Sequence, residues 1–250
     1  MSAVDVYWIT AFIDLPADGH EVGVRFWSAM TGFEPSPPRG TTGEFLTLLP
    51  ATGAPHLAVQ RIDEGPPGIH LDLHVTSVDA AAEAAVALGA TVVARLDYTV
   101  MRSPGGYVFC FVDHPAGPEP APAGGPGPIR PYQVSLDVPA ERYDADVAFW
   151  SSLLGDGPIE AADSDFTAIR TDAPLPVRLL CQRLGPGDDG GARAHLDVAA
   201  GVLNGDIATD QVALGAEVVG TFEHWIALRD PAGMDYCLTT IDPVTGRRPG

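Results

Sequence analysis

The sequence predicts an α+β fold built from two tandem copies of one module, and three observations lead to this prediction. Segment 12–32 recurs as segment 135–155, and further matches follow in the same order. A stretch rich in proline, glycine and alanine lies between the copies. Within each copy, short β-favouring segments alternate with a few stretches of helical spacing, which is the pattern of α+β folds with short strands.

The repeat holds over almost the whole length of each copy. The Phe26–Trp27 pair recurs as Phe149–Trp150, and Cys110 recurs as Cys237. The other matches are 70–72 with 195–197, 87–93 with 213–219, and 102–110 with 229–237. The spacing drifts only from 123 to 127 residues. Small loop insertions explain this drift, so the two copies indicate a duplication.

Between the copies, segment 114–131 has no hydrophobic periodicity. Its many prolines disfavour both helices and central strands, so it predicts a linker. The expected organisation is module 1 at 1–113, a linker at 114–129, module 2 at 130–243 and a tail at 244–250.

Each copy is expected to run strand, helix and several strands, twice. In the first copy we expect strands at 5–15, 44–50, 56–62, 69–75, 91–96, 98–103 and 107–112, and helices at 18–31 and 77–90. Ser77 suits the N-cap of the second helix, and Gly32 and Gly89 suit the helix ends because glycine tolerates the left-handed conformation found there.

The charge balance excludes several classes of partner. The chain has 33 Asp and Glu against 14 Lys and Arg, a net charge of −19. This charge argues against binding to nucleic acid or to an anionic membrane surface. No run approaches the ~20 apolar residues of a membrane span, and no signal-like segment opens the chain. With three cysteines and no CxxC pattern, a cytoplasmic location is expected.

The stretch GIHLDLHV places His70, Asp72 and His74 at alternate positions. Alternate residues of a strand share one face, so each His–Asp pair can form an intrastrand contact that tunes the imidazole as a base. The echo RAHLDVAA repeats the pair as His195 and Asp197, whereas His74 has no twin. The four paired residues are the candidate catalytic groups, with a structural pair as the alternative.

Three motifs in order carry a resemblance to a known family. They are FW with a glycine five residues after the tryptophan, HLDLHVTSVDAA with LGA, and RSPGGYVFC with its twin RDPAGMDYC. Together they resemble the vicinal oxygen chelate superfamily of glyoxalases, bleomycin-resistance proteins and extradiol dioxygenases. By this resemblance, each module is a pair of βαβββ units whose strands form a curled, cup-shaped mixed sheet that holds the ligand.

The resemblance also implies metal-ligand positions on the first, fifth and last strands of each module. They fall on Thr10, His70 and Cys110 in the first copy, and on Gln133, His195 and Cys237 in the second. Both copies carry cysteine where the family usually has glutamate. Zinc accepts histidine and thiolate ligands, so the second set is the better candidate. The alternative is that both cysteines are small buried hydrophobes.

Further side chains are expected on the strands that line the cups. His74, Tyr98, Arg102, Trp225 and Arg229 are candidate ligand-binding residues. The aromatic residues could stack on a flat ligand, or belong to the core. For Arg102 and Arg229 the alternative is structural pairing with an acid.

The incomplete metal sets favour a small-molecule-binding protein over a metal enzyme. The alternative is a metal-dependent or histidine-based lyase, isomerase or dioxygenase-type enzyme acting on a small oxygenated metabolite. No cofactor is expected on the first interpretation, and a divalent Zn, Ni, Mn or Fe ion on the second. The expected partner is a small molecule, and the chain is expected to be a monomer or a homodimer.

Overall fold

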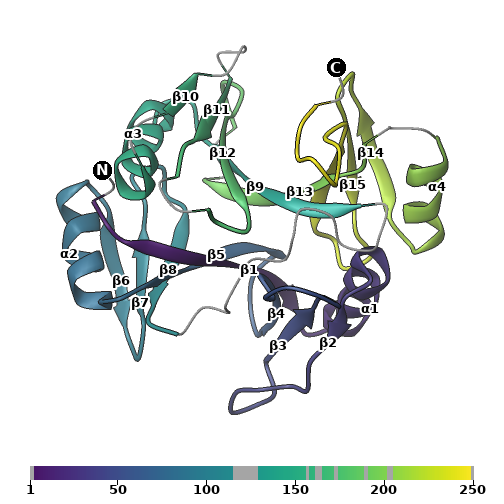
Figure 1. Cartoon of the computed structure of the whole chain (residues 1–250), viewed down its shortest axis with the longest axis horizontal. Helices are drawn as coiled ribbons and strands as arrows, with labels where there is room; N and C mark the ends of the chain where they lie inside the picture. The colour runs from purple at the N-terminus through teal and green to yellow at the C-terminus, as the bar shows by residue number, and fades with distance from the viewer. Residues whose placement is uncertain are drawn as a thin grey trace. The chain divides into compact units, whose positions relative to one another are not determined.

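The computed structural model describes residues 3–114, 129–155, 158–160, 165–171, 174–188, 191–201 and 205–248. The first copy contains eight strands and two helices in the predicted order (Figure 1). They are β1 (Val6–Pro16), α1 (His20–Thr31), β2 (Glu34–Pro35), β3 (Phe45–Leu49), β4 (Leu57–Ile62), β5 (Gly68–Val75), α2 (Val78–Ala87), β6 (Thr91–Arg95), β7 (Thr99–Arg102) and β8 (Val108–Val112).

The second copy repeats this order. Its elements are β9 (Arg130–Val138), α3 (Tyr143–Leu154), β10 (Pro158–Glu160), β11 (Phe166–Ile169), β12 (Arg178–Arg183), β13 (Arg193–Ala199), α4 (Gly205–Ala213), β14 (Glu217–Thr221), β15 (Trp225–Arg229) and β16 (Asp235–Thr239). The predicted α+β fold with two tandem modules of paired βαβββ units is therefore confirmed.

Each copy forms one open, mixed sheet of eight strands. The strand orders are β2-β3-β4-β1-β5-β8-β7-β6 and β10-β11-β12-β9-β13-β16-β15-β14. The pairs β5–β8 and β13–β16 are parallel, whereas the neighbouring hairpins are antiparallel. The parallel pairs bring the two strands that carry the candidate site residues side by side in each sheet.

The helix ends follow the predicted local chemistry. The Ser77 hydroxyl accepts a hydrogen bond from the Ala80 amide at the start of α2. Gly32 ends α1 at φ 70°, a left-handed angle that favours glycine, and Gly89 follows α2 at φ 104°. The sequence did not predict β2 or β10, because strands of two and three residues are too short to show a periodic pattern.

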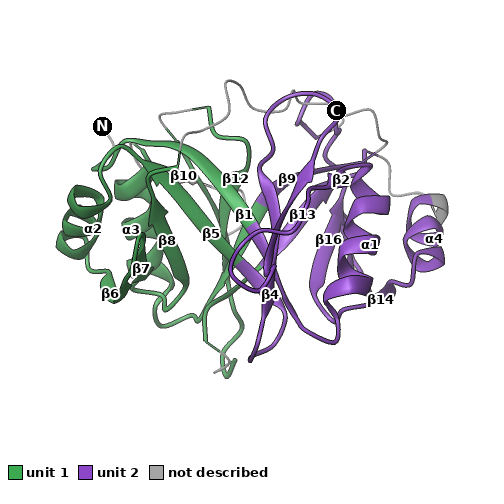
Figure 2. Ribbon diagram, turned by 90° about the horizontal axis from the view of Figure 1, so that it is seen from below, with its two compact units in different colours: residues 1–11, 70–116, 134–194 green, residues 12–69, 117–133, 195–250 purple. Residues whose placement is uncertain are grey.

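The chain divides into two compact units, and each combines parts of both copies (Figure 2). Unit 1 comprises residues 1–11, 70–116 and 134–194, and unit 2 comprises residues 12–69, 117–133 and 195–250. The predicted boundaries between modules stay a prediction. Of the predicted linker, residues 115–128 lie outside the described residues.

In each unit, the repeated Phe–Trp pair of one copy packs on the last strand of the other. In unit 1, the Trp150 ring of α3 lies 4.9 Å from the Phe109 ring of β8, measured between centroids. In unit 2, the Trp27 ring of α1 lies 5.4 Å from the Tyr236 ring of β16. All four rings are buried. The Phe–Trp pairs of both helices therefore serve packing.

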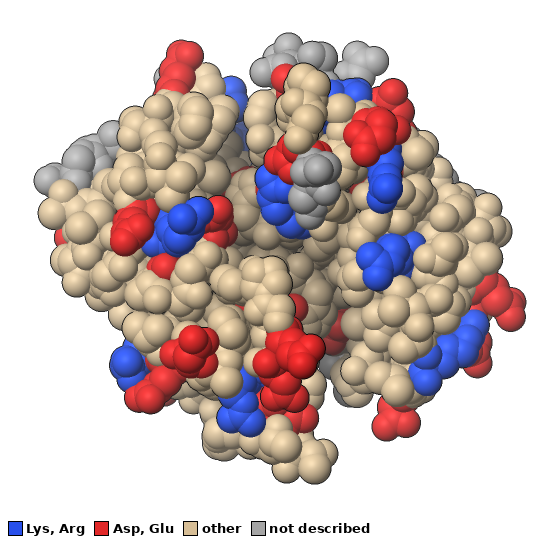
Figure 3. Space-filling view, turned by 180° about the vertical axis from the view of Figure 1, so that it is seen from behind, with Lys and Arg blue, Asp and Glu red and all other residues tan. Residues whose placement is uncertain are grey.

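On the face drawn in Figure 3, acidic and basic side chains are scattered over a largely uncharged surface. Among the described residues, no helix is long and apolar enough to span a membrane.

Candidate functional site

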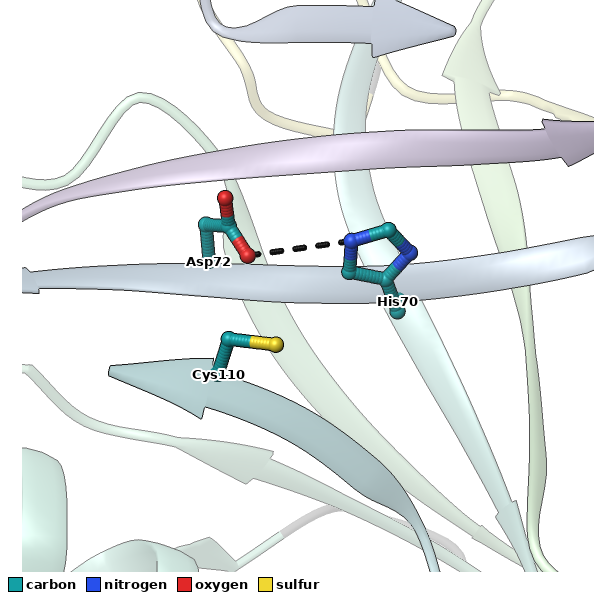
Figure 4. A group of neighbouring side chains, drawn as sticks. All are labelled: His70, Asp72 and Cys110. Atoms are coloured by element: carbon teal, nitrogen blue, oxygen red, sulfur yellow. Dashed lines mark ion pairs between the residues drawn. The ribbon is translucent and has the colours of Figure 1, made fainter. Parts of the chain in front are cut away.

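The first candidate site is a cluster of His70, Asp72 and Cys110, here called the first cluster. His70 and Asp72 lie on one face of β5, and Asp72 is the register partner of Cys110 on the parallel strand β8. His70 Nε2 lies 3.7 Å from Asp72 Oδ1, and the donor atoms of all three residues lie within 4.8 Å of one another. Figure 4 shows the carboxylate and the thiol approaching the same side of the imidazole ring.

The second cluster consists of His195, Asp197 and Cys237 and repeats this geometry. Asp197 is the register partner of Cys237 across the parallel pair β13–β16. His195 Nε2 lies 3.4 Å from Asp197 Oδ1, and the three donor atoms again lie within 4.8 Å of one another. The side chains of His195 and Asp197 are only 14% and 7% exposed, so the cluster is shielded from most of the solvent.

The donor sets fit a zinc-type metal ion. Imidazole nitrogen, carboxylate oxygen and thiolate sulfur are all zinc ligands. Two such ligands, each about 2.1 Å from a tetrahedral ion, lie about 3.4 Å apart. The observed N–O distances of 3.4 and 3.7 Å match this separation and exceed the usual length of an N–H···O hydrogen bond.

The aspartates are the ligand candidates that sequence reasoning missed. Asp72 and Asp197 were predicted to contact the histidines, and both contacts are present. The resemblance placed the third metal ligand on the first strand instead, at Thr10 and Gln133. The available signal was the shared strand face, because His and Asp at alternate positions point the same way.

The first-strand residues behave differently in the two copies. In the second copy, Gln133 Nε2 donates a hydrogen bond of 2.6 Å to Asp197 Oδ2, so Gln133 joins the second cluster. In the first copy, Thr10 Oγ1 lies 3.0 Å from His74 Nε2. The predicted role of both residues as metal ligands stays a prediction.

His74 belongs to a hydrogen-bonded chain beside the first cluster. Its Nδ1 lies 2.9 Å from the carbonyl oxygen of His114, which also accepts a hydrogen bond from the Tyr7 hydroxyl. Burial lowers the pKa of His74, and the nearby His114 ring lowers it further, against the opposing effect of the carbonyl. His74 is therefore a neutral ring held between Thr10 and a backbone oxygen.

The predicted aromatic residues flank the two clusters. Burial raises the pKa of Tyr98, and the nearby Cys110 thiol and Asp72 carboxyl group raise it further. In the second copy, Trp225 stacks on Phe222 with ring centroids 4.8 Å apart and planes 19° apart. Trp225 and Cys237 lie on adjacent antiparallel strands, and the register places both side chains on one face of the sheet.

The two predicted arginines make hydrogen bonds to residues close to them in the sequence. Arg229 makes two hydrogen bonds to Asp235, of 2.7 and 3.2 Å. Arg102 donates to the carbonyl oxygen of Gly106 at 3.4 Å. These contacts favour structural pairing, and the ligand-binding role of both residues stays a prediction.

Comparison with known proteins identifies the fold. A family model described as a glyoxalase-like domain matches residues 10–112 and 133–239. The Mn(II)-bound glyoxalase from Novosphingobium aromaticivorans matches with a TM-score of 0.63 at 18% identity, covering 92% of this chain and 80% of that protein. No curated protein matches the sequence.

Dioxygenases are also among the similar structures. BphC, a halotolerant catechol dioxygenase, matches with a TM-score of 0.59 at 12% identity, over 95% of this chain and 87% of that protein. The 2,2',3-trihydroxybiphenyl 1,2-dioxygenase from Sphingomonas wittichii strain RW1 gives a TM-score of 0.57 at 14% identity, over 95% and 90%. At these identities the similarity shows the fold alone.

Proposed function

Because the chain belongs to the family of glyoxalase-like domains, in the vicinal oxygen chelate superfamily, we propose that it binds a small oxygen-bearing molecule beside a divalent metal ion. The observation that carries this proposal is the convergence of histidine, aspartate and cysteine in both copies. By the resemblance, Cys110 and Cys237 stand where the family usually has glutamate. The aspartates nevertheless complete a set of three donors at each site. One similar structure is a Mn(II)-bound glyoxalase, which supports a metal ion in a protein of this fold.

The donor chemistry favours zinc over harder ions. Thiolate is a soft ligand that selects zinc, whereas manganese prefers carboxylate, carbonyl and water oxygens. A bound zinc ion would polarise a carbonyl or hydroxyl oxygen of the ligand. Around the first cluster, the Tyr98 hydroxyl can donate a hydrogen bond to the ligand. Around the second, Trp225 offers a flat apolar surface.

A metal-free proton transfer is the second candidate, favoured by the two His–Asp ion pairs. A carboxylate 3.4 to 3.7 Å from an imidazole stabilises the protonated ring. His70 or His195 could therefore take a proton from a bound metabolite and return it. This interpretation uses the same residues but needs no metal.

The metal content of the purified protein tests the proposal. The full chain should be prepared without a polyhistidine tag, saturated with Zn²⁺, desalted and analysed for metal. We expect bound zinc in the wild type, and none in the variant carrying both His70→Ala and His195→Ala. His224→Ala is the control, because His224 is half-exposed and lies outside both clusters.

A wild type that retains no Zn²⁺, Mn²⁺, Fe²⁺ or Ni²⁺ after saturation would overturn the metal site. The metal-free candidate then predicts that a thermal-shift screen of small keto acids, aldehydes and diols still finds ligands. Their stabilising effect should be lost in the double histidine variant and kept in His224→Ala. If the ligands still stabilise both variants, both candidates are ruled out.

A further inference from the structure

In the second copy, a row of register partners crosses the sheet from the second cluster to the edge strand. Asp197 pairs with Cys237, and Cys237 pairs in turn with Ala227. Ala227 pairs with Gly220 on β14, which is the outermost strand of this sheet. Side chains of register partners point to the same face of a sheet. The methyl group of Ala227 and the open position at Gly220 therefore lie on the face that carries the second cluster.

A stacked pair of aromatic rings stands at the far end of this row. A Cβ atom added to Gly220 would lie 3.1 Å from Cε2 of Phe222, so the Phe222 ring lies over this glycine and on the face of the cluster. The Trp225 ring stacks on Phe222 with its plane only 19° away. Phe222 is 51% exposed, so a ligand can reach its ring.

The first copy fills the same row with larger side chains. Cys110 pairs with Val100, and Val100 pairs with Ala94 on the edge strand β6. Valine and alanine thus occupy the positions of Ala227 and Gly220 in the second copy. The surface between the cysteine and the edge strand is accordingly raised by three carbon atoms in the first copy.

The residue at the end of the row also differs between the copies. The amide of Leu96 donates a hydrogen bond of 2.7 Å to the carbonyl oxygen of Tyr98, and the amide of Phe222 donates one of 2.9 Å to that of Trp225. Leu96 and Phe222 therefore hold equivalent places. Leu96 is 64% exposed and offers an aliphatic side chain where the second copy offers a ring face.

We propose that the second cluster selects a ligand with a flat ring, whereas the first cluster does not. This inference rests on the proposed function and adds the class of ligand that each site prefers. Cys237 and Gly220 flank Ala227 on opposite sides, and neighbouring strands lie about 4.8 Å apart. A ring placed over Ala227 thus has the metal donors on one side and the Phe222 ring on the other. Phe222 and Ala227 are the specificity-determining residues.

Calorimetric titration with three hydroxamic acids tests this inference. Benzohydroxamate, cyclohexanecarbohydroxamate and acetohydroxamate carry the same two metal-binding oxygens on a flat ring, a puckered ring and a methyl group. The zinc-loaded variant His70→Ala retains the second cluster, and His195→Ala retains the first. We expect His70→Ala to bind benzohydroxamate about fivefold more tightly than the cyclohexane compound. His195→Ala should bind these two compounds equally.

Further substitutions in the His70→Ala background test the two residues. Phe222→Leu introduces the residue of the first copy and should abolish the preference for the flat ring. Leu96→Ala changes the equivalent position of the first copy, so it is the matched control and should keep the preference. Ala227→Val should weaken the binding of both ring compounds and leave that of acetohydroxamate unchanged. Zinc content and thermal melting show whether each variant retains the metal and the fold.

The outcomes separate this inference from the proposed function. Equal affinity for the flat and the puckered ring in His70→Ala, or the same preference in His195→Ala, would overturn the assignment while zinc binding still stands. Zinc-loaded protein that binds none of the three compounds would overturn it as well. An unchanged preference in Phe222→Leu would overturn the role of this ring. Protein that retains no zinc would overturn the proposed metal site, and this inference with it.

Discussion

In both units, a buried carboxylate joins the turn before the last strand to the helix that packs on that strand. The turn supplies the carboxylate in unit 2, and the helix supplies it in unit 1. In unit 2, Asp230 lies in the turn before β16. Its carboxylate accepts hydrogen bonds from the Trp27 indole and from the amides of Ala232 and Met234. In unit 1, the equivalent turn residue is Ser103, and the carboxylate comes from the helix as Asp146. It accepts from the Trp150 indole and the Gly105 amide.

The small residue that faces this carboxylate also comes from a different element in each unit. Asp146 corresponds to Gly23 in the first copy, and Gly105 corresponds to Ala232 in the second. A Cβ on Gly105 would lie 2.5 Å from Asp146 Cγ, and one on Gly23 would lie 3.2 Å from the Cβ of Ala232 in the opposite turn. The requirement common to both units is a buried acceptor for an indole and a turn amide. Either the turn or the helix can supply it, provided that the opposite residue is small.

Removal of either carboxylate should give the largest effect, and the loss should be greater in unit 2. Each buried donor left without a partner costs about 1–3 kcal/mol. Asp230→Ala leaves three buried donors without their acceptor and should lower the free energy of unfolding by about 4 kcal/mol. Asp146→Ala should lower it by about 3 kcal/mol. Urea denaturation measures both. A loss below about 1 kcal/mol in Asp230→Ala would show that the turn does not depend on this acceptor.

The buried His56 should make unit 2 less stable at acidic pH, whereas the buried carboxyl groups should have the opposite effect on stability. Burial lowers its pKa to about 4, and neither ring nitrogen makes a hydrogen bond of normal geometry. The folded state binds this proton less readily than the unfolded state does. The stabilisation is therefore present above pH 6.5 and is lost as the pH falls from 6.5 towards 4.

Burial raises the pKa of both Asp146 and Asp230, so these groups act in the opposite direction. Their contribution is greatest below the unfolded pKa and is lost as the pH rises through the folded value. At pH 5, the His56 contribution should cost the wild type about 2 kcal/mol relative to pH 7. In urea denaturation, His56→Leu should not show this loss of stability between pH 7 and pH 5. If the variant and the wild type lose equal stability, His56 is not the acid-sensitive group.

The exchange of small residues between the copies predicts a coupling between two sites. Gly105→Ala alone should cost about 2 kcal/mol, because the new methyl group meets the Asp146 carboxyl group. In a background carrying Ser103→Asp and Asp146→Gly, which reproduces unit 2, the same change should cost little. The backbone at Gly105 is not left-handed, so alanine itself is tolerated there. Equal costs in the two backgrounds, measured by urea denaturation, would contradict the steric account.

Much of the fold followed from local patterns in the sequence. The alternation around His70 and Asp72 predicted a strand with both side chains on one face, and β5 has that arrangement. The repeat predicted a second cluster at His195. Neither pattern could show that Asp72 would stand beside Cys110, because that contact depends on the register of two strands far apart in sequence.

The sequence by itself determined the duplication, the order of the elements, the family resemblance and the positions of the histidines and cysteines. These features depend on periodicity, glycine and proline positions and matched motifs, all of which act over short stretches of chain. The tertiary structure alone decided that halves of different copies pack together, as Trp27 does with Asp230, 203 residues away. It also decided that Gln133 holds Asp197 while Thr10 holds His74. Such choices depend on which side chains packing brings within hydrogen-bond distance, and a repeated sequence pattern does not fix them.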